Sequence, residues 1–198
     1  MKNILKNIKE NKLFTTLLII TILSILLGIL FPAILTTDNK ELIKTSITDY
    51  FTAIDNNKIE YIKSLITILS NNIFVTISIW LLGISIIGII IIIIEVFIKG
   101  FIVGFSLTSI LVTYGIKGIL IGIIYTISNI LSLLVTFLLS YYAISFSIMI
   151  YKTIFKKKNY PKEIIVKRYI KIGLLALLSS IVISLIEVFI IPKVLMFL

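Results

Sequence analysis

The chain has 198 residues, of which 59% are hydrophobic and 14% are charged, and its mean hydropathy is +1.18. This composition excludes an ordinary soluble domain, in which about 45–50% of residues are apolar, and the lack of cysteine and histidine excludes disulfides, thiolate or imidazole metal ligands and imidazole bases. The net charge of +10 is concentrated in two short segments beside apolar runs, which is the positive-inside pattern of membrane proteins and argues against nucleic-acid binding.

The first predicted elements are a basic N-terminus and a membrane span. Residues 1–12 contain four lysines and one glutamate, and an apolar run over residues 13–35 follows them. This run is longer than the core of a signal peptide, which has about 7–15 residues, and it has no small-residue cleavage site. We therefore expect an uncleaved first span whose preceding basic residues lie in the cytoplasm.

Residues 36–72 form the one sizeable polar segment of the chain. Apolar side chains recur there at steps of three and four, as on one face of a helix: Ile43, Ile47, Tyr50, Phe51 and Ile54. We expect an extracytoplasmic amphipathic helix, or a pair of helices, lying near the bilayer surface. This element is either a simple connector with interfacial aromatic residues or a surface that docks a partner.

Two spans are predicted next, over residues 73–95 and 99–114. Glu95 and Lys99 stand four residues apart where these spans meet, so they share a helix face and can pair. The pair is either an interfacial salt bridge at a helix end or a functional intramembrane site. Small residues let helix backbones approach closely in a membrane, and we expect such packing at four glycines: Gly83, Gly88, Gly100 and Gly104.

The apolar run over residues 119–151 has about 33 residues and would be roughly 50 Å long as one helix. That length exceeds the membrane core of about 30 Å. The polar residues ending at Asn129 predict a break, so that the region 100–129 would hold one span and a re-entrant half-helix before a full span over about 130–150. A continuous tilted helix with Asn129 in a helix–helix contact is the alternative.

The chain ends with a basic loop and a fifth span. Residues 152–171 contain eight basic residues and one glutamate, which predicts a cytoplasmic loop that attracts anionic lipid. The span over residues 172–191 contains Glu187, and this carboxylate is either an intramembrane functional group or an interfacial one. The sequence thus predicts one all-α membrane domain of about five spans, with the N-terminus in the cytoplasm and the C-terminus outside.

One block of sequence carries a family resemblance. It runs from Trp80-Leu-Leu-Gly-Ile-Ser-Ile-Ile-Gly88 through an apolar stretch to Lys99-Gly-Phe-Ile-Val-Gly-Phe105, and it resembles the stage II sporulation protein M family. The chain length, the five-span layout, Ser145-Phe146-Ser147 and Glu187-Val-Phe-Ile-Ile-Pro192 agree with that family. Relatives tend to have a proline before the residue equivalent to Asn129, where this chain has Ser128, and this departure weakens the prediction of a broken helix.

The resemblance implies a role in endospore formation. Proteins of this family sit in the mother-cell membrane at the sporulation septum during engulfment. They act as the membrane component of a complex with two peptidoglycan-degrading partners, the stage II sporulation proteins D and P. By this resemblance the chain would be a scaffold that recruits and localises these hydrolases while the membrane migrates around the forespore.

The residues themselves agree with a scaffold better than with an enzyme. Glycan cleavage usually needs paired carboxylates about 5–10 Å apart, whereas the carboxylates in the outer segment are scattered among lysines. A zinc site is improbable without histidine or cysteine, and the intramembrane serines have no nearby base. We therefore expect no catalytic residue, cofactor or metal. The alternative function is a small polytopic transporter or channel with a broken-helix site. The sequence is also compatible with a homo-oligomer.

Overall fold

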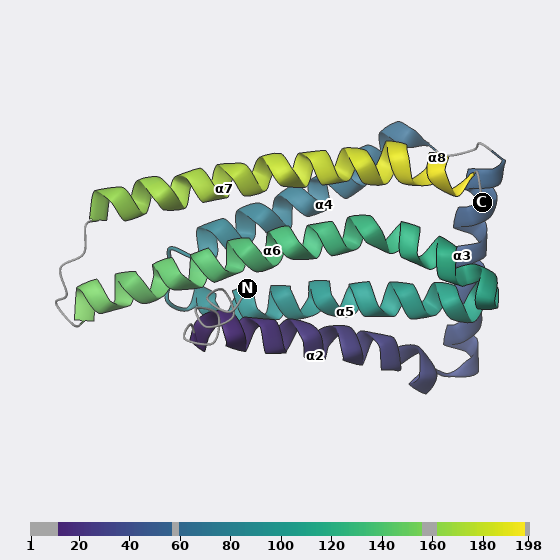
Figure 1. Cartoon of the computed structure of the whole chain (residues 1–198), viewed down its shortest axis with the longest axis horizontal. Helices are drawn as coiled ribbons and strands as arrows, with labels where there is room; N and C mark the ends of the chain where they lie inside the picture. Colours follow the sequence, from purple (N-terminus) through teal and green to yellow (C-terminus); the bar gives the residue numbers. More distant parts are fainter. Residues whose placement is uncertain (1–11, 57–59, 156–161, 197–198) are drawn as a thin grey trace, which may run out of the picture.

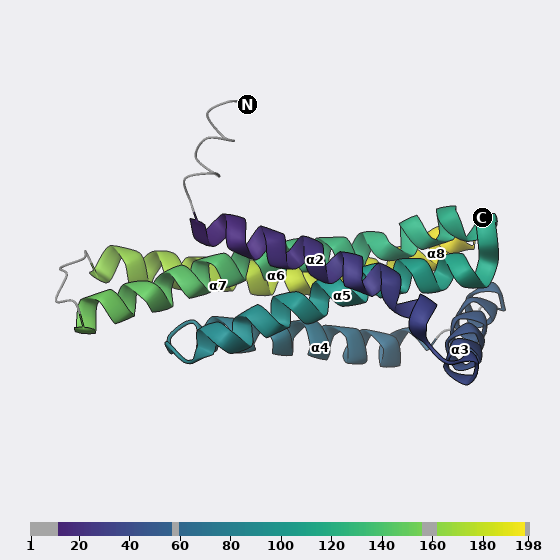
Figure 2. The same ribbon diagram turned by 90° about the horizontal axis from the view of Figure 1, so that it is seen from below.

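The computed structural model describes residues 12–56, 60–155 and 162–196, and this part of the chain is helical throughout without a strand. Five long helices run alongside one another: α2 (Lys12–Ile34), α4 (Tyr61–Leu82), α5 (Gly88–Tyr114), α6 (Gly118–Phe155) and α7 (Lys162–Leu185). A further helix, α3 (Thr37–Asp55), lies across one end of this bundle (Figure 1 and Figure 2). The predicted all-α membrane bundle is confirmed.

Four stretches of the described chain are long and apolar enough to cross a membrane. One of them, Gly88–Phe155, is a hairpin in which the 3-10 turn Gly115–Lys117 joins α5 to α6. Gly115 has a φ of 59°, which favours glycine because a side chain is strained there. Helices α5 and α6 have 27 and 38 residues, so each is as long as the roughly 20 residues that a span requires.

Small polar side chains are buried within the apolar core of the bundle, and aliphatic side chains cover its outside. Ser24, Ser140 and Ser184 have no exposed surface, whereas Leu30 is 63% exposed and Ile87 is 76% exposed. Small buried side chains let the helices approach closely, and exposed aliphatic side chains match the hydrocarbon of a bilayer. The fold is therefore that of a protein whose surrounding solvent is lipid.

Helix α3 is the amphipathic helix predicted in the outer segment. Its buried Ile54 packs against Ile191 and Leu195 from the C-terminal end of the chain, and Phe51 of α3 packs at the edge of this cluster. Phe51 also meets the ring of Tyr114 edge-on, with 5.3 Å between the ring centroids. The predicted polar segment is shorter than expected, however, because residues 61–72 belong to α4.

The predicted boundary between the second and third spans is wrong. Helix α4 ends at Leu82 and α5 begins at Gly88, so the expected span over residues 73–95 is interrupted by a turn. Helix α5 then continues to Tyr114 without a break at Glu95 or Lys99. The turn contains Gly83 and Ser85 and ends at Gly88, but its isoleucines resemble a span and its glycines resemble packing contacts, whereas the two charges within α5 resemble a helix end.

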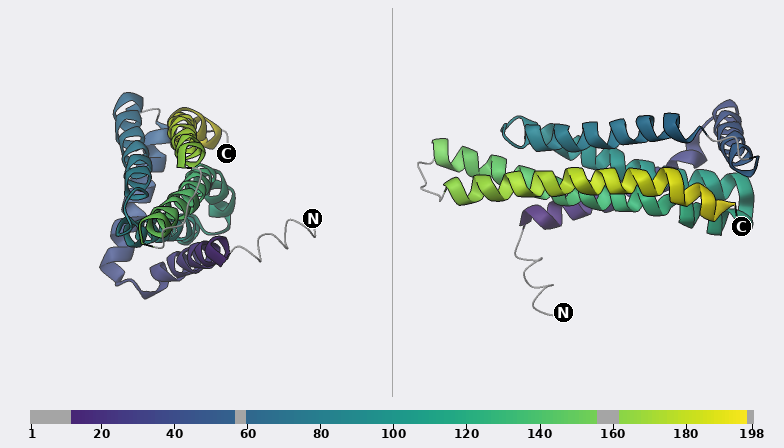
Figure 3. Two further views of the ribbon diagram at one scale, coloured as in Figure 1. Left: turned by 90° about the vertical axis from the view of Figure 1, so that its left-hand side faces the viewer. Right: turned by 90° about the horizontal axis from the view of Figure 1, so that it is seen from above.

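The predicted break and re-entrant half-helix in the region 100–129 are also wrong. Helix α6 is continuous through Asn129, and Ser128 Oγ donates a hydrogen bond back along the same helix to Tyr125 O at 3.4 Å, where it caps no helix start. Its 38 residues make a helix of roughly 57 Å. Part of this length projects from the bundle, because the end of α6 and the start of α7 extend beyond the turn between α4 and α5 (Figure 1 and Figure 3).

The last helix changes its winding near the C-terminal end. Helix α7 continues into a π-helical segment, η2 (Ile186–Ile190), and a short helix α8 (Ile191–Leu195). Pro192 has no backbone N–H, and its ring crowds the carbonyl one turn earlier, which explains the wider winding just before it. Glu187 lies in this π-helical segment. Most of the predicted basic N-terminus, residues 1–11, and residues 156–161 of the predicted basic loop lie outside the described residues.

Candidate functional site

A network of polar side chains lies between α4, α5, α6 and α7. At its centre, the Lys99 ammonium on α5 donates hydrogen bonds to Asn72 Oδ1 on α4 and to Ser132 Oγ on α6, each at 3.2 Å. Ser132 Oγ lies 3.4 Å from the same Asn72 oxygen. One cation therefore holds three helices together through neutral oxygen atoms.

Asn72 extends the network to the fourth helix. Its Nδ2 donates to Ser184 Oγ on α7 at 3.0 Å, and one turn away Thr76 Oγ1 and Ser180 Oγ share a hydrogen bond of 2.7 Å. Asn72 is only 6% exposed, and both ends of its amide have partners. Hydrogen bonds between membrane helices contribute on average about 0.6 kcal/mol each, so the network fixes the register of four helices more than it adds stability.

The charged residues predicted as candidates are placed differently from the expectation. Glu95 and Lys99 form no salt bridge, and the ion pairs found in the described part of the chain, Lys63–Glu60 and Lys167–Glu163, are exposed. Lys99 turns into the bundle instead, where it donates hydrogen bonds to Asn72 and Ser132, and the carboxylates of Glu187 and Glu95 both attract it electrostatically. A charge inside a membrane is costly unless polar groups surround it, and the oxygens of Asn72 and Ser132 supply that environment.

Asn129 does not join this network. It is half-buried on α6, three residues before Ser132, and its side chain makes no hydrogen bond to the described residues. Lys99 is therefore within the electrostatic reach of both Glu187 and Glu95, whereas Asn129 lies outside the network.

The predicted glycines lie at two close contacts. At the first, Gly100 and Gly104 on α5 face α2: a Cβ at Gly104 would collide with the backbone oxygen of Ile25, and one at Gly100 with the hydroxyl of Ser24. Gly28 on α2 faces α5 in return, where a Cβ would collide with the backbone oxygen of Phe101. Glycines on both partners thus bring these two helices into backbone contact.

The second contact is the turn between α4 and α5, which contains Gly83 and ends at Gly88. A Cβ at Gly83 would collide with the hydroxyl of Tyr169 on α7, and one at Gly88 with the Leu82 carbonyl. Tyr169 Oη donates to the Trp80 carbonyl at 2.6 Å, which fastens α7 to the end of α4.

Helix α6 holds the same turn from its other side. Ser147 Oγ on α6 donates to the Ser85 carbonyl within the turn at 2.8 Å. The Tyr169 ring stacks on Phe146 of α6 with 4.1 Å between the ring centroids. The sequence block around Trp80 and the serines near Phe146 therefore meet at one place in the fold.

Sequence reasoning missed the partners of these residues. Asn72, Ser132 and Ser184 are single polar residues on three different helices, and nothing local shows that they converge. Gly28 could have been found, because it follows Ser24 at the four-residue spacing that close helix contacts favour. The network surrounds the Lys99 ammonium with oxygen atoms and sets the register of the helices. The described residues contain no group of three or more His, Cys, Asp or Glu side chains that could hold a metal ion.

The comparisons with known proteins agree with the family resemblance. The family model described as Stage II sporulation protein M matches residues 17–192. No curated protein and no solved structure matches the chain. The matched region includes the turn, the glycine contact and the polar network, and the chain belongs to the stage II sporulation protein M family of sporulation membrane proteins.

Proposed function

We propose that this protein is the membrane scaffold of a sporulation engulfment complex, which recruits peptidoglycan hydrolases, the stage II sporulation proteins D and P, and localises them at the septum. The observation that carries the proposal is the placement of α3 across one end of a tightly packed bundle (Figure 1). A helix fixed in this way offers a rigid surface beyond the lipid, which a recruiting protein needs.

The proposed orientation follows from charge. The start of α2, the end of α6 and the start of α7 lie at one end of the bundle, and α3 and the C-terminus lie at the other (Figure 1). Basic residues mark the first of these ends: Lys12, Lys152, Lys167, Arg168 and Lys171. By the positive-inside rule that end lies in the cytoplasm of the mother cell, and α3 faces the peptidoglycan.

The chain would supply position and its partners would supply the chemistry. With no histidine or cysteine in the sequence, the zinc ligands that amidases usually use are missing. Among the serines inside the bundle, Ser147 and Ser184 donate hydrogen bonds from their hydroxyls to backbone carbonyls, and Ser132 accepts a hydrogen bond from the Lys99 ammonium.

Affinity purification of the tagged full-length protein from sporulating cells tests the proposal. We expect both hydrolases to be recovered, and we expect fewer with Thr45→Arg combined with Asp49→Arg, two exposed positions of α3. Glu163→Gln, at the exposed opposite end, serves as the matched control and should leave recovery unchanged. Absence of both hydrolases from the wild-type sample would overturn the proposal.

A small transporter or channel is the second candidate, because Lys99 and the π-helical segment with Glu187 lie among the spans, and π-helical turns are frequent at functional sites. Proteoliposomes that contain only this protein separate the two functions. A solute flux that Glu187→Gln abolishes would support transport, whereas a scaffold gives no flux.

A further inference from the structure

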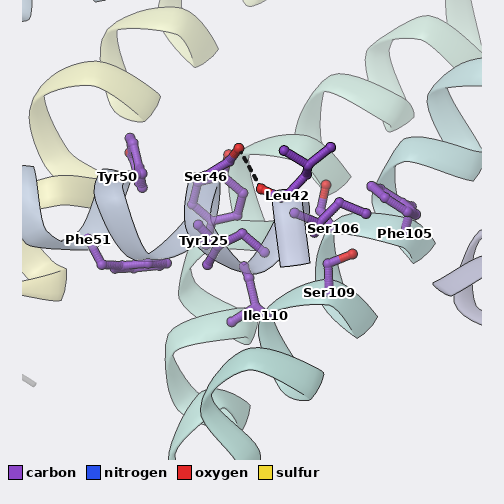
Figure 4. Close-up of a pocket in the computed structure, with 11 residues that line it drawn as sticks. Leu42, Ser46, Tyr50, Phe51, Phe105, Ser106, Ser109, Ile110 and Tyr125 are labelled. Atoms are coloured by element: carbon purple, nitrogen blue, oxygen red, sulfur yellow. Dashed lines mark hydrogen bonds between the residues drawn. The ribbon is translucent and has the colours of Figure 1, made fainter. Parts of the chain in front are cut away.

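A cavity lies beneath α3, between this helix, the last turns of α5 and the first turns of α6. Its volume is about 430 Å³, within the usual range of ligand pockets. Its lining is mainly aliphatic and aromatic, from Ile47 and Phe51 of α3, Phe105 and Ile110 of α5, and Tyr125 of α6 (Figure 4). The cavity is thus suited to an apolar ligand.

A second cavity of about 220 Å³ lies next to the first, toward the start of α3. The two cavities share Ile43 and Ser109 in their linings, so they adjoin at these residues, and the second cavity is the more polar of the two. This second cavity, the mouth, carries charges: Lys40 and Lys44 line it together with Glu41, which leaves an excess of one positive charge. Lys40 Nζ donates one hydrogen bond, to the Ala33 carbonyl at 3.3 Å, and an ammonium has two further donors.

Ser109 provides an independent sign of a missing partner. Its residue is 5% exposed, and its hydroxyl has no hydrogen-bond partner among the described residues. An unpaired buried hydroxyl costs about 1–3 kcal/mol. It lies where the two cavities meet, so a ligand that passes from the mouth to the interior would bring an oxygen atom close to it.

We propose that the two adjoining cavities together bind one phospholipid with an anionic headgroup. The headgroup phosphate lies between Lys40 and Lys44, a glycerol ester oxygen accepts the hydrogen bond of Ser109, and an acyl chain fills the apolar interior beneath α3. Charge complementarity at the mouth selects an anionic over a zwitterionic headgroup. The site does not rest on the proposed scaffold function.

The surroundings of the cavity favour a lipid over a water-soluble ligand. Val112, which lines the second cavity, is 69% exposed, and Leu42, which lines the first, is 66% exposed. These side chains lie near the end of the membrane-length helix α5, where headgroups meet hydrocarbon. A lipid can therefore enter sideways from the bilayer, with its headgroup at the level of the lysines.

Photocrosslinking tests the proposal on the full-length protein in phosphatidylcholine nanodiscs, with a phosphatidylglycerol that carries a photoreactive group in one acyl chain. We expect crosslinks to peptides that contain Ile47 or Ile110, and unlabelled phosphatidylglycerol should compete for them. Lys40→Gln with Lys44→Gln should reduce this labelling at least about tenfold, because each lysine beside an anionic headgroup strengthens binding several-fold.

Three further variants keep the test decisive. Lys40→Arg with Lys44→Arg retains both charges and should retain labelling, and Lys63→Gln, an exposed lysine of α4 outside both cavities, should have no effect. Ser109→Phe should fill the junction and abolish labelling while circular dichroism shows the helices intact. Equal labelling by a photoreactive phosphatidylcholine, or labelling that the glutamine pair leaves unchanged, would overturn the proposal.

Discussion

Lys99 donates a hydrogen bond to Asn72 across two helices, with 3.2 Å between Nζ and Oδ1, although Glu95 stands only four residues from it on its own helix. The Asn72 amide links this ammonium to a further helix. The opposite end of the Asn72 amide donates to Ser184, so the side chain connects the ammonium on α5 to the hydroxyl on α7. The cation is thus tied to the packing of the bundle.

Asn72→Ala should therefore destabilise the folded protein by about 1–3 kcal/mol, because it leaves a buried charge with one fewer partner. Combining it with Lys99→Met should recover part of the loss, since the charge is then absent. Thermal unfolding in a mild detergent measures both. Glu95→Ala is the control, and we expect a small effect because this carboxylate forms no salt bridge. If Glu95→Ala costs as much as Asn72→Ala, the network does not hold Lys99.

Gly104→Leu should prevent normal packing of α2 against α5, because even a Cβ at this position would collide with the Ile25 carbonyl. We expect the free energy of unfolding to fall by more than about 1–3 kcal/mol, since backbone atoms cannot move aside as side chains do. Fluorescence-detected gel filtration should show a lower level of folded protein. Gly122→Ala is the matched control: its new Cβ would meet the flexible end of Leu107 at 3.2 Å. Normal accumulation of Gly104→Leu would show that this face contacts only lipid.

Tyr169→Phe removes the hydroxyl that bonds to the Trp80 carbonyl at 2.6 Å and keeps the ring stacked on Phe146. We expect the free energy of unfolding to fall by about 0.5–1.5 kcal/mol, the usual net contribution of one hydrogen bond. Tyr169→Ala also loses the stacking and should cost clearly more. Chemical unfolding of both variants in detergent checks this order. No loss in Tyr169→Phe would mean that the hydrogen bond contributes nothing, and equal losses in the two variants would mean that the ring stacking contributes nothing.

The proposed orientation can be tested with single cysteines, because the natural chain has none. Asp49→Cys on the exposed face of α3 should react with a membrane-impermeant thiol reagent in intact cells. Glu163→Cys at the start of α7 should react only after the membrane is permeabilised. The reverse pattern would invert the topology and place α3 in the cytoplasm.

The sequence predicted the class of fold and the order of its elements, because long apolar runs and basic flanks follow directly from the thickness and charge preference of a membrane. It misplaced the turn between α4 and α5, since Ile84, Ile86 and Ile87 give that turn the composition of a span. The polar network could not be predicted, because Asn72, Lys99 and Ser132 meet only after the helices have packed. Periodicity along one helix does not predict which neighbouring helix a polar side chain will face.

We propose that this protein positions wall hydrolases at the septum. The most direct measurement is the location of fluorescently tagged stage II sporulation proteins D and P in sporulating cells, with and without this protein. Our account predicts septal foci in its presence and dispersed fluorescence along the mother-cell membrane in its absence, with foci restored by the wild-type chain. Hydrolases that still gather at the septum without this protein would contradict the account.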